Sequence, residues 1–282
     1  MGDHICLREV VHTSLGDIEY CSAGKGIPVL FIHGGHSNCN DTLCHKGFDP
    51  DRYQLITPSR PGYGATPLGD NKTPRQAAEL IAELIRYLSL SQVIIYGVSA
   101  GGLTAIAFAS CFPGITRKLV LASAVTKEWL DKNGKTYKAA KILFGPSLQG
   151  FTWAMIRFMG KAFPGMIAKN FYRQFSKVAH HRLRKEDRLA LIAALNKYSS
   201  KDGFINDINQ KGVNGAIANV KCPTLIIHSE HDNSVPVEHA LFAGQLIKDA
   251  RIEVLQNEWG HLFWIGADSD RSIEKTVQFI EE

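Results

Sequence analysis

Several features that mark particular classes of protein are missing from this sequence. No run of about 18 apolar residues occurs in its 282 residues, so we expect no transmembrane helix. Residues 1–14 lack the apolar core of a signal peptide, and Cys6 stands where a myristoylation motif has Ser or Thr. The six cysteines include no C-x-x-C spacing. We therefore expect no metal site, and mostly reduced thiols in a cytoplasmic protein.

The sequence also has little net charge, but its charges are distributed unevenly. The formal net charge is +5, and fractions of 45% apolar and 21% charged residues are ordinary for a globular protein. Residues 127–211 hold 17 Lys and Arg against 6 Asp and Glu, whereas the remainder holds 15 against 21. The middle third is therefore expected to be a distinct unit. No nucleic-acid-binding motif accompanies the positive charge, so we expect no nucleic-acid partner.

Short apolar runs alternate with helical patterns over most of the chain. Residues 7–12 and 17–21 alternate in polarity around a turn, which predicts a β-hairpin. Helical periodicity covers residues 75–89, 100–112 and 271–281. Uniformly apolar runs, typical of strands buried on both faces of a parallel sheet, occur at residues 29–32, 53–57, 93–96, 118–122, 224–228 and 251–255. The alternation predicts an α/β fold with a doubly wound, mostly parallel sheet.

The alternation is interrupted in the middle of the chain. Residues 127–213 contain no convincing strand, and their helical periodicity is broken at Gly and Pro positions such as 145–146 and 164–165. We therefore expect a core domain made of residues 1–126 and 214–282, with residues 127–213 inserted between two strands as a helical cap or lid.

Ser99 lies at a predicted turn between a strand and a helix. The segment from Val93 to Gly102 reads V-I-I-Y-G-V-S-A-G-G, in which a buried strand leads into G-x-S-x-G. A serine on such a sharp turn adopts strained dihedral angles, and Gly97 and Gly101 avoid the clashes that side chains would cause. Free N–H groups at the start of the following helix stabilise negative charge near the hydroxyl. Ser99 is therefore the candidate nucleophile.

This segment and others resemble the α/β-hydrolase superfamily over nearly the whole chain outside the insertion. His33-Gly34-Gly35 follows the third strand, as the H-G-x element of that family does. The segment S-R-P-G-Y-G at residues 59–64 resembles the D-x-R-G-x-G loop, with Ser59 in place of the usual acid and Pro61 inserted. The resemblance implies an α/β-hydrolase fold with a helical cap, and a serine hydrolase activity.

The resemblance implies that a catalytic acid and then a histidine follow Ser99 along the chain. Asp232 matches the acid in G-x-x-D-x-x-V-P, with Glu230 as the alternative, and residues 122–126 contain no earlier acid. His261 matches the G-H element after the last strand. Of the rival histidines, His33 is expected to be a structural hydrogen-bonding residue. His228 and His231 flank the acid and could hardly reach back to it, and His180 and His181 are expected to be solvated.

The resemblance further implies a complete hydrolytic site without a cofactor or metal. His261 would take the proton of Ser99, and Asp232 would orient and stabilise the imidazole. The N–H groups of Gly35 and Ala100 would form the oxyanion hole. Side chains and backbone next to these groups are expected to bind a small acyl substrate, namely Gly34, His36, Val98 and Leu262, and Cys39 and Cys44 are candidate cavity-lining thiols.

Related chemistries of the same fold remain as alternatives. A serine nucleophile argues against dehalogenases and epoxide hydrolases, which use Asp. Proline iminopeptidases usually show H-G-G-P-G, whereas His36-Ser37 replaces Pro-Gly in this chain. C–C bond hydrolases commonly carry Trp directly after the histidine, where Leu262 stands. Ester hydrolysis is the prediction, with a C–C hydrolase, an aminopeptidase or a catalytically silent binding protein as alternatives.

The insertion interleaves apolar and cationic residues. Between Phe151 and Lys177, ten aromatic or methionine side chains alternate with five Lys or Arg. We favour cap helices that pack on the core with their lysines in solvent, and we expect a cavity that is apolar on its cap side. The alternative is peripheral contact of the basic cap with an anionic membrane surface.

Overall fold

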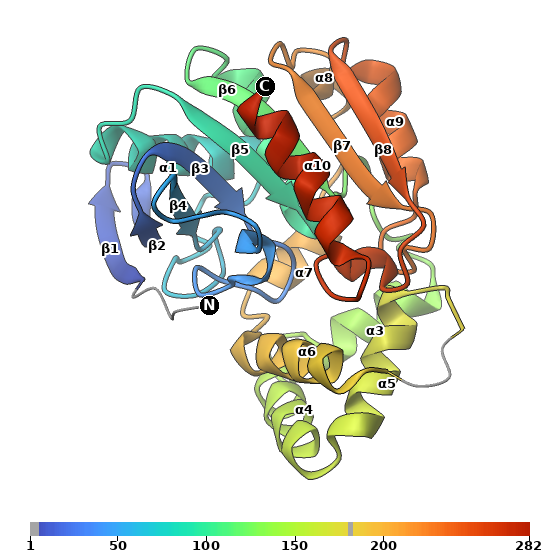
Figure 1. Cartoon of the computed structure of the whole chain (residues 1–282). Coiled ribbons are helices and arrows are strands. Elements are labelled where there is room, and N and C mark those ends of the chain that lie inside the picture. Colours follow the sequence, from blue (N-terminus) through green and yellow to red (C-terminus); the bar gives the residue numbers. More distant parts are fainter. Residues whose placement is uncertain (1–5, 180–182) are drawn as a thin grey trace.

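The computed structural model describes residues 6–179 and 183–282, so the predictions about residues 1–5, His180 and His181 lie outside it. Its centre is one eight-stranded sheet with the spatial order β1-β2-β4-β3-β5-β6-β7-β8 (Figure 1). The strands are β1 (Leu7–Thr13), β2 (Gly16–Gly24), β3 (Ile27–Ile32), β4 (Tyr53–Pro58), β5 (Val93–Val98), β6 (Thr116–Ala122), β7 (Thr224–Ser229) and β8 (Ala250–Leu255). Each predicted run therefore forms a strand.

The sheet is mostly parallel. β1 and β2 form the predicted hairpin, and β2 pairs antiparallel with β4. All other neighbouring strands, from β4 to β8, pair parallel. The central strands are buried along most of their length because helices cover both faces of the sheet. The prediction of a doubly wound, mostly parallel α/β fold is confirmed.

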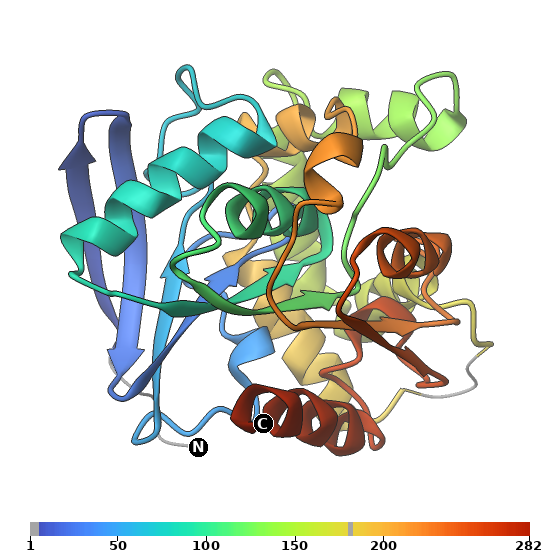
Figure 2. The ribbon, with the colours of Figure 1, turned by 90° about the horizontal axis from the view of Figure 1, so that it is seen from above.

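Helices cover the two faces of the sheet in separate layers. α1 (Pro74–Tyr87), α2 (Gly102–Cys111) and α9 (Glu238–Leu246) lie on one face, and α10 (Ser269–Glu281) lies on the other (Figure 2). One core cluster joins the first three helices to the sheet through residues such as Ile81, Phe108 and Ile226. A second cluster joins α10 to the opposite face through Phe279 and Ile280. No helix in the described ranges is long and apolar enough to cross a membrane.

Residues between β6 and β7 form helices and no named strand in the part that the structure describes. They are α3 (Lys135–Leu143), α4 (Gln149–Ala162), α5 (Pro164–Phe175), α6 (Lys185–Lys197), α7 (Gly203–Ile208) and α8 (Asn214–Ile217). Most of this layer lies beyond one end of the sheet (Figure 1). Buried residues of α4 and α5 pack against Trp259 and Leu262, which follow β8. We refer to residues 127–213 as the cap.

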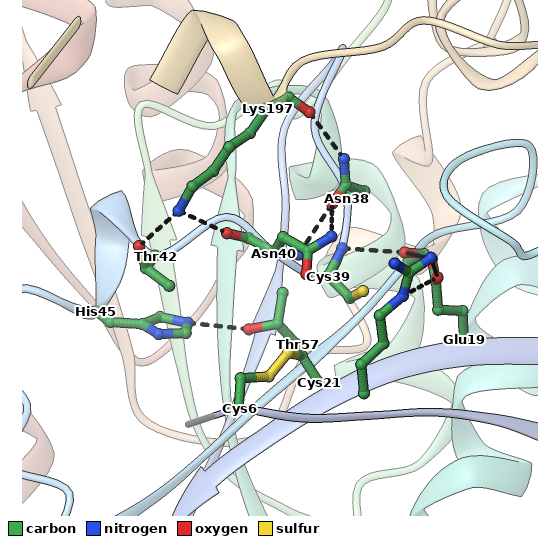
Figure 3. Close-up of a disulfide and its surroundings, with 12 residues drawn as sticks. Cys6, Glu19, Cys21, Asn38, Cys39, Asn40, Thr42, His45, Thr57 and Lys197 are labelled. Atoms are coloured by element: carbon green, nitrogen blue, oxygen red, sulfur yellow. Dashed lines mark hydrogen bonds and ion pairs between the residues drawn. A yellow bond between two sulfur atoms is a disulfide. The ribbon is translucent and has the colours of Figure 1, made fainter. Parts of the chain in front are cut away.

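A disulfide joins Cys6 to Cys21 of β2 (Figure 3). This pair was not predicted, because the number and spacing of the cysteines carry no specific signal for it. The remaining four cysteines are free thiols, of which Cys39, Cys44 and Cys222 are buried and Cys111 is exposed. The prediction that most of the six thiols are reduced did not single out any cysteine, and Cys6 and Cys21 are the pair that departs from it.

Candidate active site

Ser99 occupies the sharp turn that its sequence predicts. It follows β5, begins the short 3-10 helix Ser99–Gly101 and has a positive φ of 50°. A Cβ atom on Gly97 would lie 2.4 Å from the Ala105 Cβ, and one on Gly101 would lie 2.4 Å from the Ile32 carbonyl oxygen. Both glycines are therefore required by close packing of the turn against α2 and β3, and the strained serine is held in place.

Ser99, His261 and Asp232 come together although they are far apart in the sequence. Asp232 lies in the loop after β7, and His261 lies in the 3-10 helix Gly260–Leu262 after β8. The Ser99 Oγ is 3.0 Å from the His261 Nε2, and the His261 Nδ1 is 2.7 Å from the Asp232 Oδ2. A proton on Nδ1 is donated to Asp232, which leaves Nε2 free to accept the proton of the Ser99 hydroxyl.

Asp232 is fully buried and accepts other hydrogen bonds besides the one from His261. Its Oδ1 accepts the backbone N–H groups of Ser234 and Val235, each at 2.8 Å. Burial alone would raise the pKa of this carboxyl. His261 beside it and the hydrogen bonds that His228 and His261 donate outweigh burial and lower the pKa to about 2. The carboxylate is therefore ionised at neutral pH and fixed in orientation.

The sequence prediction that His228 could not reach the acid is wrong. His228 Nε2 lies 3.3 Å from the Asp232 Oδ2, and it also donates to the Val235 carbonyl at 2.8 Å. The loop after β7 folds back so that both side chains meet inside the protein, where neither is exposed. His231 instead pairs with Glu230, 3.5 Å away. The Glu230 side chain is 42% exposed, so it does not occupy a triad position.

The loop after β3 lies beside Ser99 and is held by Arg60. Arg60 donates to the carbonyl oxygens of His33 and Gly34, at 2.8 and 3.1 Å. The Arg60 backbone N–H donates to the His33 Nε2, and burial, with Arg60 nearby, keeps the pKa of His33 well below its usual value. His33 is thus a neutral structural residue, as the sequence predicts. Within the described ranges, the N–H groups of Gly35 and Ala100 donate no hydrogen bond to another protein group.

A cavity of about 210 Å³ opens next to Ser99 and His261. All four predicted substrate-binding residues lie in its wall, namely Gly34, His36, Val98 and Leu262. Gly35 also lines it, whereas Ala100 does not. His36 is tied to Ser200 by a hydrogen bond of 2.8 Å, and burial lowers its pKa to about 3. It therefore presents a neutral aromatic ring to the cavity.

Other cavity residues were missed by sequence reasoning. Phe144, Tyr198 and Phe204 of the cap line the cavity, and the only hint of them was the apolar character of the insertion. Asp41 is the one carboxylate in its wall, and no Lys or Arg lies in that wall within the described ranges. Cys44 lines the cavity and Cys39 does not. The sequence of this loop gives no indication of which of these two cysteines lines the cavity.

The family model for the alpha/beta hydrolase fold matches residues 27–267, so the chain belongs to that family. It is 35% identical to the "Uncharacterized hydrolase YcgS" of Bacillus subtilis, with 94% of this chain and 95% of the relative covered. It is 26% identical to a 2-hydroxy-6-oxo-2,4-heptadienoate hydrolase of Pseudomonas putida, with 95% and 91% covered. An alpha/beta hydrolase fold protein from Nakamurella multipartita superposes with a TM-score of 0.78 at 25% identity, covering 97% and 98% of the two chains. The chain is therefore a hydrolase of this fold.

Proposed function

We propose that the protein is a serine hydrolase that cleaves a carboxylic ester of a small, partly apolar substrate. Ser99 is the nucleophile, His261 the general base and then the general acid, and Asp232 the group that orients His261. The observation that carries the proposal is the chain of contacts from Ser99 through His261 to Asp232, at 3.0 and 2.7 Å. The strained φ of Ser99 beside a cavity supports the same role.

The reaction follows from these contacts. His261 takes the hydroxyl proton as the Ser99 Oγ bonds to the ester carbonyl carbon, and the oxyanion forms next to the N–H groups of Gly35 and Ala100. His261 then gives the proton to the leaving alcohol as the acyl-enzyme forms. Water, deprotonated by His261, attacks the acyl group, and the acid leaves while Ser99 regains its proton. No cofactor or metal is required by this sequence of steps.

The cavity supports a short, uncharged acyl group. Its volume of about 210 Å³ is below the range of roughly 300–1,000 Å³ typical of sites for drug-sized ligands. Eight of its lining residues are Phe, Trp or Tyr, and Asp41, the one carboxylate of the described wall, disfavours a second negative charge. A dienoate, as in the name of the Pseudomonas relative, carries a carboxylate that no cation in the described wall would balance. This favours ester hydrolysis over C–C bond cleavage of such an anion.

The proposal is tested first by covalent labelling. A fluorophosphonate probe should label the wild-type protein, and Ser99→Ala should abolish labelling without a change in melting temperature. Ser89→Ala is a suitable control, because Ser89 also has a positive φ but is exposed just after α1 and does not line the cavity. Folded wild-type protein that resists the probe would leave the silent binding protein as the better interpretation.

The bond type is tested with a substrate panel. We expect 4-nitrophenyl acetate and butyrate to be hydrolysed, with kcat/KM falling as the acyl chain exceeds the cavity. A 2-hydroxy-6-oxo-2,4-dienoate and a prolyl 4-nitroanilide should be cleaved at least about 100-fold more slowly than the butyrate, the scale on which an enzyme site discriminates by contacts. Preferred turnover of either one would favour the C–C hydrolase or the aminopeptidase.

Two further assignments are proposals of the same kind. The core–cap division at residues 126–127 and 213–214 is supported by the position of α3 to α7 between β6 and β7.

A cytoplasmic location is the second proposal, and it rests on features of the sequence alone. The Cys6–Cys21 disulfide is evidence against this location, because disulfides persist mainly in oxidising compartments.

A further inference from the structure

Large apolar side chains are concentrated on the outer faces of α4 and α5. Phe151, Met155 and Phe158 follow one another along α4 at spacings of four and three residues, so they share one face of the helix. Phe163, between the two helices, and Met166, in the first turn of α5, continue this surface. Phe151, Phe158 and Phe163 are 65%, 63% and 56% exposed. The cap helices pack on the core through Trp153 and Tyr172, as the sequence predicts, but these five apolar side chains take no part in that packing.

The same segment is positively charged without any compensating acid. Residues 132–185 contain 12 Lys and Arg and no Asp or Glu. Lys161 and Lys169 are exposed on α4 and α5, and Lys138 and Lys141 are exposed on α3. Within the described ranges, none of these four lysines forms an ion pair. The ammonium groups of Lys161 and Lys169 are therefore available to anions on α4 and α5, and those of Lys138 and Lys141 are available on α3.

We propose that the outer faces of α4 and α5 dock the protein onto an anionic lipid bilayer. The aromatic and methionine side chains enter the boundary between headgroups and acyl chains, and the lysines contact lipid phosphates. A helix face with this combination binds in the plane of a membrane without spanning it. α4 and α5 lie in the layer of helices beyond one end of the sheet (Figure 1).

Other occupants fit this surface less well. A second copy of the chain would bring two uncompensated positive surfaces together, which is unfavourable. A nucleic-acid backbone would satisfy the lysines but would leave Phe151, Phe158 and Phe163 in water. A bilayer satisfies both kinds of side chain at once.

Docking at this face would also orient the candidate active site. The inner sides of the same two helices contribute Trp153, Phe171 and Phe175 to the cavity wall. One layer of helices therefore separates the cavity from the proposed lipid surface. A docked enzyme would hold its cavity one layer of helices away from the bilayer surface.

The proposal is tested by co-sedimentation of the full-length protein with vesicles. We expect binding to vesicles of three parts phosphatidylcholine to one part phosphatidylglycerol, and little binding to pure phosphatidylcholine. Raising NaCl from 0.1 to 0.5 M should weaken binding, because the lysine contacts are screened. The double variant Phe151→Ser/Phe158→Ser should lower the partition coefficient at least about tenfold, since two aromatic side chains no longer leave water.

Matched variants separate docking from general effects. Tyr87→Ser removes an aromatic side chain that is 59% exposed on α1, in the core domain, and should bind vesicles like the wild type. Lys161→Gln/Lys169→Gln should lose the preference for anionic vesicles while retaining the melting temperature. Equal binding to both kinds of vesicle, equal binding of the Phe double variant and wild type, or dimerisation in solution that the Phe variants abolish would overturn the proposal. The vesicle experiment does not depend on whether Ser99 is reactive.

Discussion

Asp232 is the residue on which the proposed orientation of His261 depends most directly. Replacing it with Asn keeps its size but removes the charge that stabilises a protonated His261, and the new amide favours the wrong imidazole tautomer. We expect Asp232→Asn to lower kcat for 4-nitrophenyl butyrate by about 10⁴-fold, as in other triads of this kind. Circular dichroism at pH 7 should remain unchanged, and steady-state kinetics gives the measurement.

The natural control is the alternative acid two residues earlier. Glu230→Gln removes an exposed charge next to His231 and leaves the Asp232–His261 contact intact, so its kcat should match the wild type. Loss of activity in Glu230→Gln together with an active Asp232→Asn would reverse the assignment of the acid.

At the residue scale, local geometry was predictable and side-chain orientation was not. Gly97 and Gly101 were predictable because a strand–turn–helix fixes where their Cβ atoms would go. His228 was misjudged because its contact with Asp232 depends on how one loop folds back inside the protein. A second contact that the sequence could not predict involves Ser59, which replaces the acid of the family motif. Glu19 of β2 supplies a buried carboxylate there, and it accepts a hydrogen bond from the Ser59 hydroxyl at 2.6 Å. No spacing rule connects residues on different strands in this way.

At the scale of elements, α7 is tied to the loop beside Ser99 by one buried ion pair. Arg60 donates two hydrogen bonds to Asp207, at 2.7 and 2.8 Å, and both side chains are almost fully buried. Asp207→Ala would leave the Arg60 charge unpaired inside the protein. We expect the free energy of unfolding to fall by about 3–5 kcal/mol, measured by urea denaturation.

The same variant should affect catalysis more than stability alone would. Arg60 also holds the carbonyl groups of His33 and Gly34, so its displacement moves the predicted oxyanion loop. At a temperature where Asp207→Ala is folded, kcat should fall while KM changes little. Asp202→Ala, in the exposed turn just before α7, is the control and should match the wild type in both measurements. Unchanged stability of Asp207→Ala would mean that water or another group compensates Arg60.

The elements differ in how well the sequence predicted them. Strands β3 to β7 were clear because burial on both faces demands continuous apolar runs. The cap was predicted only as a helical zone, without helix bounds. The reason is visible on α4, where Trp153 is buried and Phe151 and Phe158 are exposed, so apolar residues lie on both sides and give no single periodic face.

At the scale of the whole molecule, two chemically different parts are combined in one chain. The core carries the sheet and the proposed triad of Ser99, Asp232 and His261, and the cap carries the positive charge and most of the aromatic side chains in the cavity wall. The charge contrast in the sequence predicts only that the middle third is a distinct unit, and the candidate catalytic residues are predicted from the motifs instead. The sequence could not indicate the aromatic surface on the outside of the cap, because the packing of the helices determines which aromatic side chains are buried and which are exposed.

The Cys6–Cys21 disulfide is the feature of the whole molecule that depends on its redox environment. It closes a loop of 15 residues around the β1–β2 hairpin, and restricting such a loop in the unfolded chain is worth about 3 kcal/mol. We expect a reducing agent to lower the free energy of unfolding of the wild type by about that amount, and Cys6→Ser to be insensitive to the reductant. Cys111→Ser, which removes the exposed free thiol, should respond to the reductant like the wild type. If the purified wild type shows no response and six free thiols by titration, the bond is absent and the cytoplasmic prediction is strengthened; a full response favours an oxidising compartment.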